Sequence, residues 1–261
     1  PSTVGHKALA VNLSDLAAQG ADPAWVTLGI ALPAADWGWL DGFCEGFFAL
    51  TDYYGVQLVG GDTTRGPLSI AVQAHGFVDP GKALLRSGAR PDDRIFVTGT
   101  LGDAGAGLAL TAAPSTDHQH YLLNRLQRPQ PRVEQGRSLV GIASAAIDIS
   151  DGLAQDLGHI LKRSNAGAII HVDALPISMA LKTELQGDYT KAIDYALSAG
   201  DDYELCFTVP PEKLPKLREA TATWQCDCTE IGVIVSRPGL RCLDKNGGDY
   251  SMRLSGYEHF V

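Results

Sequence analysis

Residues 146–153, with the sequence Ala-Ile-Asp-Ile-Ser-Asp-Gly-Leu, predict a buried strand that turns directly into a helix. The turn carries Asp148, Ser150 and Asp151. Carboxylates in this position can hold Mg²⁺ ions, and the serine can bind phosphate. The same motif taken alone also fits an ordinary helix cap at Ser150 or Asp151, with Asp148 as a turn residue.

Three further segments present carboxylates: a predicted helix carries Asp15 on a polar stripe, Gly60-Gly61-Asp62 follows a short buried strand predicted over 56–59, and Gly200-Asp201-Asp202 precedes another strand. An aspartate beside glycine at a strand end points into a crevice where a divalent ion and a phosphate can approach. Each segment also has a simpler interpretation. Asp15 fits a solvated surface carboxylate, and residues 60–62 fit a tight glycine turn.

Length, composition and charge limit the class of protein. The chain has 261 residues, of which 45% are hydrophobic, so it can bury a substantial core in one large or two modest domains. Its formal net charge of −9 disfavours nucleic-acid binding. No apolar stretch approaches the roughly 20 residues that span a bilayer. Five cysteines without a Cys-x-x-Cys pair indicate a reducing compartment, so we expect a cytoplasmic protein.

Hydrophobic periodicity predicts strands alternating with helices along the whole chain. Strands are expected over 25–32, 68–78, 95–98, 146–149, 168–172, 203–209, 230–235 and 240–243. Helices are expected over 7–18, 40–50, 118–127, 132–144, 151–166, 178–186, 190–198 and 212–222. The turn Asp79-Pro80-Gly81 is the predicted domain boundary, giving an N-terminal domain over 1–80 and a C-terminal domain over 81–261.

Other catalytic chemistry has few candidates. The glycines from Gly99 to Gly107 match neither a Walker loop nor a dinucleotide fingerprint, and we expect them to let a helix pack closely on the sheet. Arg86 is a candidate for a bidentate phosphate contact, with a solvated arginine as the alternative. The histidines lack metal spacing, and no serine or cysteine has a nucleophile motif. Direct phosphoryl transfer therefore remains, which depends on positioning and metal rather than on a catalytic nucleophile.

Longer segments of the sequence resemble bacterial thiamine-monophosphate kinases. These segments are 7–25, 60–67, 86–93, 148–153 and 202–208, and they arrive in the family's order over nearly the whole chain. The resemblance implies the α/β and α+β fold of the aminoimidazole-ribonucleotide synthetase superfamily. In that fold an N-terminal α/β domain dimerises through its sheet, and a C-terminal α+β domain follows.

The resemblance also implies an activity and a set of site residues. It implies transfer of phosphate from ATP to thiamine monophosphate, directly and in line, with Mg²⁺ as cofactor and thiamine diphosphate as product. The implied metal ligands are Asp15, Asp62, Asp148 and Asp151, the implied ATP contacts are Gly61, Asp62, Arg86 and Ser150, and the implied thiamine contacts are Asp201 and Tyr257. A homodimer is expected, with no nucleic-acid or membrane partner.

The sequence departs from the family pattern in two places. The family has roughly sixty further residues ahead of the position of Pro1, carrying additional ligands, and we expect weak activity from a molecule that lacks them. Asp201 stands where the family usually has the longer Glu. The alternatives are another ATP-using enzyme of the same superfamily, or a catalytically incomplete nucleotide- or metal-binding module.

Overall fold

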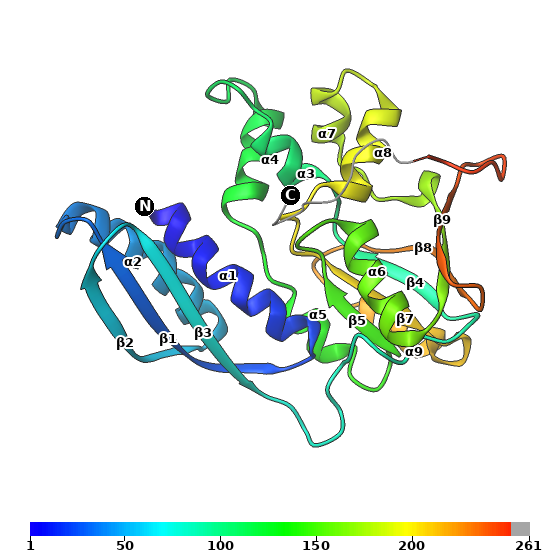
Figure 1. Cartoon of the computed structure of the whole chain (residues 1–261), viewed down its shortest axis with the longest axis horizontal. Coiled ribbons are helices and arrows are strands. Elements are labelled where there is room, and N and C mark those ends of the chain that lie inside the picture. Colours follow the sequence, from blue (N-terminus) through cyan, green and yellow to red (C-terminus); the bar gives the residue numbers. More distant parts are fainter. Residues whose placement is uncertain (252–261) are drawn as a thin grey trace.

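The first part of the chain builds a three-stranded sheet with two helices on one face (Figure 1). Its elements are α1 (Ser2–Ala18), β1 (Asp22–Leu32), α2 (Trp37–Tyr54), β2 (Gln57–Arg65) and β3 (Ser69–Phe77). β1 is the central strand, parallel to β2 and antiparallel to β3. The computed structural model describes residues 1–251, and Tyr257 lies outside these described residues.

The two helices of this part cross closely because glycines lie at the contact. A side chain at Gly5 of α1 would collide with the backbone of α2, and a side chain at Gly46 of α2 would collide with that of α1. Leu13, Phe43 and Phe47 are buried in the core around this helix pair. The helices therefore form one rigid layer against the small sheet.

The second part forms a six-stranded sheet in the order β5-β7-β4-β8-β6-β9. Every neighbouring pair is antiparallel except the parallel pair β6 and β9. The strands are β4 (Arg94–Thr98), β5 (Ala145–Asp148), β6 (Gly167–His171), β7 (Leu205–Val209), β8 (Cys228–Val235) and β9 (Gly239–Leu243). The helices are α3 (Asp103–Leu108), α4 (Asp117–Gln127), α5 (Val133–Ser138), α6 (Leu153–Ser164), α7 (Met179–Glu184), α8 (Tyr189–Ser198) and α9 (Leu214–Thr221).

Helix α1 joins the two parts, lying between the small sheet and the rest of the chain in Figure 1. One hydrophobic cluster contains Leu13 of α1 together with Phe96 of β4 and Phe207 of β7, whose rings stack with centroids 5.7 Å apart. An apolar core shared across two domains resists their relative motion. The residues of α1 therefore keep a fixed place beside the end of β5.

The predicted elements are present, with three corrections. Residues 60–62 do not form a turn after a buried strand; they lie inside β2, which is exposed along nearly all its length. The helix predicted over 132–144 ends at Ser138, and Gly141 then turns the chain with φ of +75°. Glycines of the run 99–107 allow close packing, but Gly105 and Gly107 pack against α8 and α4 rather than the sheet. Within residues 1–251, none of the helices combines the length and apolarity that crossing a bilayer requires.

Candidate active site

The turn between β5 and α6 lies beside α1, so residues far apart in sequence meet there. Asp148 ends β5 and is only 4% exposed. Ser14 of α1 donates a hydrogen bond from Oγ to Asp148 Oδ2 at 2.8 Å. Burial raises the pKa of Asp148 to about 6, with the negative charge of Asp15 as the next cause. Two of the predicted metal ligands, Asp15 and Asp148, are therefore electrostatic neighbours.

Arg86 faces the same two carboxylates from the segment between β3 and β4. Burial raises the pKa of Asp15, and the positive charge of Arg86 opposes that shift. Arg86 also opposes the rise in the pKa of Asp148. The structure thus brings Arg86 together with Asp15 and Asp148. The single positive charge of the guanidinium compensates the two negative charges only in part.

Asp156 shapes the turn that carries Ser150 and Asp151. Its Oδ2 accepts hydrogen bonds from the backbone N–H groups of Ser150, Asp151 and Gly152 at 3.0, 2.9 and 3.1 Å. Gly152 has φ of +116°, and a side chain there would press on the backbone of Ser198. Neither Ser150 nor Asp151 caps α6 with its side chain, so the helix-cap alternative is wrong. The Ser150 hydroxyl is left available for other partners, and Asp151 accepts from Gln155 Nε2 through one carboxylate oxygen, Oδ2, at 3.1 Å.

The donor set near this turn fits a hard divalent cation. Asp151, Asp156 and His159 each place one ligand atom within 4.8 Å of the others. Carboxylate oxygens are the ligands that Mg²⁺ prefers, and a cation offsets both the burial of Asp148, the main cause of its raised pKa, and its repulsion with Asp15. Sequence reasoning missed Asp156 and His159. Their spacing of three residues, which places both on one face of α6, was the available signal.

A cleft of about 640 Å³ opens between α1, β3 and the α3–α4 region. Its lining is mainly apolar and includes Val4, Val11, Ile70, Val72, Leu108 and Leu126. Asp201 lines it too, and the backbone N–H of Asp201 donates to the carbonyl of Ser150 at 2.9 Å. One residue of the cleft wall is therefore bonded directly to the β5–α6 turn, and the cleft itself suits an apolar ring with a charged group.

The residues after Asp201 follow an unusual backbone path. Asp201 and Tyr203 have φ of +66° and +51°, values that side-chain-bearing residues rarely adopt. Such conformations persist where the surrounding structure over-determines them, often at binding sites. The Tyr203 hydroxyl donates to Asp201 Oδ1 at 3.0 Å, and Lys7 Nζ lies 3.1 Å from the same oxygen. Asp201 is held in place by both groups.

Asp202, predicted as part of the same carboxylate turn, points away from the cleft. It is 1% exposed and accepts hydrogen bonds from the N–H groups of Gly102 and Ala104 at the start of α3. Glu204 is also buried and accepts from Thr98, Arg125 and Arg132. These two carboxylates hold structural elements together, and Asp201 is the acidic residue of this segment that lines the cleft.

Asp62 and Gly61 are not brought to this cluster within one chain. Asp62 is paired in register with Gly29, between the inward-facing Leu28 and Ile30 of β1, so its side chain points to the face of the sheet opposite α1. It is exposed, and its Oδ1 accepts from the N–H of Thr63. Gly61 approaches β1 so closely that a side chain would collide with the carbonyl of Leu28.

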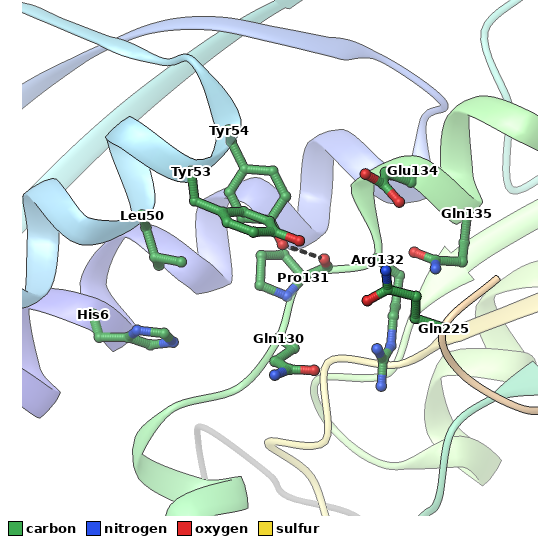
Figure 2. Close-up of a pocket in the computed structure, with 10 residues that line it drawn as sticks. All are labelled: His6, Leu50, Tyr53, Tyr54, Gln130, Pro131, Arg132, Glu134, Gln135 and Gln225. Carbon is green, nitrogen blue, oxygen red and sulfur yellow. Dashed lines mark hydrogen bonds between the residues drawn. The ribbon is translucent and has the colours of Figure 1, made fainter.

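A second hollow, of about 270 Å³, lies between α1, α2 and the segment 130–135 (Figure 2). Tyr54 donates from its hydroxyl to the carbonyl of Pro131 at 2.9 Å, and His6 lines the opposite side. His6 and Lys7 are successive residues of α1 and point about 100° apart. The two hollows therefore open on different sides of α1, and none of the predicted site residues lines this one.

Comparison with known proteins identifies the family. Residues 1–78 match the model of the AIR synthase related protein N-terminal domain, and residues 90–245 match that of the C-terminal domain. The thiamine-monophosphate kinase of Salmonella typhimurium is 50% identical over 267 residues, covering 100% of this chain and 81% of that protein. The chain belongs to the thiamine-monophosphate kinase family. The Bacillus subtilis member is 35% identical, with 100% and 82% coverage.

Solved structures of the thiamine-monophosphate kinase family have the same fold. The enzyme from Stenotrophomonas maltophilia superimposes with a TM-score of 0.89 at 46% identity, covering 95% of this chain and 80% of that one. AaThiL in complex with AMPPCP and TMP gives 0.87 at 32% identity, with 100% and 81% coverage. The predictions of the family, of the two-domain fold and of a kinase are confirmed.

Proposed function

We propose that this chain transfers the γ-phosphate of ATP to the phosphate of thiamine monophosphate, giving ADP and thiamine diphosphate. The structural observation that carries the proposal is the hydrogen bond from Asp201 N to Ser150 O. Asp201 belongs to the wall of an apolar cleft, and Ser150 belongs to the turn whose carboxylates suit metal-bound phosphates. The two parts of the site are therefore adjacent. The relative AaThiL, solved with AMPPCP and TMP, supports this pair of substrates.

The acidic residues at the β5–α6 turn have the metal-binding role in this proposal. Asp15, Asp148 and Asp151 would hold Mg²⁺, which when bound neutralises the charge of the reacting phosphates. In this proposal Arg86 pairs with a phosphate oxygen, a role supported by its positive charge beside Asp15 and Asp148. Ser150 presents a hydroxyl that no helix cap occupies. The chain itself contributes position and charge, and no covalent intermediate is involved.

The thiamine moiety occupies the cleft in this proposal. The cationic ring of thiamine pairs with Asp201, and the apolar lining packs against its rings. Tyr257, outside the described residues, supplies an aromatic face for the same ring. Asp201 is shorter than the usual Glu, and its contacts with Lys7 and Tyr203 fix the position of its carboxylate.

Gly61 and Asp62 contribute to ATP and metal binding from a second copy of the chain. Their side of the small sheet carries exposed apolar side chains, among them Val59 and Phe77, which are 57% and 63% exposed. An apolar sheet face of this kind favours association with another copy. The homodimer functions in the cytoplasm, where ATP is available, with neither nucleic acid nor membrane as partner.

A kinase assay tests the activity. The intact enzyme is mixed with thiamine monophosphate, ATP and Mg²⁺, and thiamine diphosphate is separated by chromatography and quantified. We expect product that depends on Mg²⁺ and equals the ADP formed. ATP binding without thiamine diphosphate formation would instead support a catalytically incomplete module. Analytical ultracentrifugation tests the dimer, which Phe77→Asp should weaken.

A further inference from the structure

Two residues of opposite charge form an ion pair in the wall of the cleft to which the proposed function assigns thiamine. Among the described residues that line it, Lys7 is the cation and Asp201 the anion, and their charged atoms lie 3.1 Å apart. Lys7 also lies over the ring of Tyr203, with its ammonium 5.9 Å from the ring centroid. The side chains of Lys7 and Asp201 are 27% and 36% exposed, so solvent only partly screens their attraction.

A substrate whose cationic ring pairs with Asp201 competes with Lys7 for the same carboxylate. Asp201 Oδ1 already accepts from Tyr203 and contacts Lys7 Nζ. When the ring replaces Lys7, the ammonium loses its partner in a mainly apolar cleft, which costs free energy unless another anion receives it. The displaced ammonium therefore makes binding depend on whether the incoming molecule carries an anion of its own.

The position of Lys7 on α1 determines which anion it can meet. Lys7, Val11 and Asp15 are spaced by four residues and lie along one face of the helix, with Lys7 and Asp15 about 12 Å apart along the axis. Lys7 is thus at the Asp201 end of the cleft, on the helix face that leads to Asp15. Burial raises the pKa of the Tyr203 hydroxyl, and the negative charges of Asp201, Asp148 and Asp15 raise it further.

We propose that Lys7 is a selectivity residue that favours the phosphorylated substrate over unphosphorylated thiamine, an inference that rests on the proposed function. Thiamine monophosphate carries both charges, so its cationic ring pairs with Asp201 and its phosphate pairs with Lys7. Thiamine brings only the cation and leaves Lys7 unpaired. The Lys7–Asp201 pair thus complements a ligand that carries both a positive and a negative charge. A purely cationic ligand binds less well because it leaves the Lys7 ammonium without a partner.

Lys7→Met in the intact enzyme tests this inference, because it predicts opposite changes for two ligands. Three quantities are measured: KM for thiamine monophosphate, KM for ATP and the inhibition constant of thiamine as a competitor. We expect KM for thiamine monophosphate to rise about fivefold, because its phosphate loses the ammonium. The inhibition constant of thiamine should fall about fivefold, because thiamine no longer competes with that ammonium for Asp201. KM for ATP should stay unchanged. Lys7→Arg, which keeps the charge, should retain most of the selectivity.

The control is Lys82→Met, which removes a lysine paired with Asp79 on an exposed surface and should change none of the three constants. Parallel weakening of both thiamine compounds by Lys7→Met would show a general packing role and overturn the proposal. An unchanged ratio between them would do the same. If Lys7→Met does not fold, Lys7→Gln gives the same readout with a polar side chain. Failure of the proposed function would be seen separately, as an absence of thiamine diphosphate from the unaltered enzyme.

Discussion

The segment from Asp201 to Glu204 lies between the cleft and the protein interior, and its carboxylates have different roles on the two sides. Asp201 and Tyr203 lie on the cleft side, where Asp201 is 36% exposed in its side chain. Asp202 and Glu204 point into the protein and are at most 1% exposed. The backbone here is irregular rather than extended, with φ of +66° at Asp201 and +51° at Tyr203, and it directs alternate side chains to the two sides. Adjacent acidic residues in one motif thus belong to a binding surface and to a structural network.

The two regions differ in how completely their charges are matched. Glu204 receives hydrogen bonds from Arg125, Arg132 and Thr98 at 2.6 to 2.8 Å. Asp148 instead has Ser14 as a hydrogen-bond donor and a second carboxylate, Asp15, as an electrostatic neighbour. A complete set of partners makes a buried carboxylate a structural group, whereas an incomplete set leaves it able to gain a cation. We expect substitutions to separate these roles.

The largest effect is expected at the β5–α6 turn, from Asp148→Asn. Removing one negative charge weakens metal and phosphate binding, so kcat should fall about a thousandfold. The amide has a similar shape and can still accept from Ser14, and it removes the repulsion with Asp15. The thermal midpoint without Mg²⁺ should therefore stay the same or rise. Steady-state kinetics and differential scanning calorimetry measure the two quantities.

Asp249→Asn is the matched control for Asp148→Asn, because Asp249 pairs with Arg241 on an exposed surface. Its kcat should equal that of the unaltered enzyme. If Asp148→Asn retained full kcat, or lost activity only because it unfolds, Asp148 would belong with the structural carboxylates and the contrast between the regions would fail.

The second prediction concerns the structural region. Glu204→Gln removes the carboxylate that pairs with the buried Arg125 and Arg132, although Arg125 keeps Asp103 at 3.8 Å from its Nε. We expect a loss of about 3 kcal/mol in the free energy of unfolding. Urea denaturation gives this value. Glu230→Gln breaks an exposed pair with Arg94 and should cost less than about 0.5 kcal/mol. A similar cost for both variants would show that the buried network contributes no special stability.

Sequence patterns predicted the parts of the site that depend on local structure. The strand over 146–149 and the following helix placed Asp148 and Asp151 at a turn, and the helical spacing of the first segment put Asp15 on its polar face. Asp62 was harder to place because the face on which it lies depends on strand register, which a bulge between Val26 and Thr27 shifts by one residue. The pairing of Asp202 with the start of α3 spans a hundred residues and has no local signal.

The third prediction concerns Asp156, which belongs to neither region completely, since it is buried but orients a turn of the site. Asp156→Ala removes the acceptor of three backbone N–H groups. We expect kcat/KM for ATP to fall about 10- to 100-fold, as when a group that orients metal ligands is lost. Titrating Mg²⁺ in the kinetic assay should show a weaker apparent affinity for the metal. An unchanged Mg²⁺ dependence would restrict Asp156 to the structural region.

The smallest expected effect is a pH dependence that comes from Asp202. Burial raises the pKa of Asp202 to about 8 from an ordinary value of 3.8, so the folded chain retains a proton that the unfolded chain has released. The stabilisation from this proton is complete below about pH 4 and is lost as the pH rises through about 8. Between pH 6 and 7, the free energy of unfolding should therefore fall by about 1 kcal/mol relative to Asp202→Asn.

Urea denaturation of both proteins at pH 5, 6 and 7 isolates this effect, because Asp148 and Asp156 titrate in both and cancel in the difference. A difference (unaltered protein minus Asp202→Asn) that falls as the pH rises would show that Asp202 is protonated when folded. Parallel curves would show that the N–H groups of Gly102 and Ala104, with the nearby Arg125, keep it ionised. In that case Asp202 would be an ionised buried carboxylate whose charge is compensated by its partners, like Glu204. Residues 201–204 would then have two ionised carboxylates on the interior side and Asp201 on the cleft side.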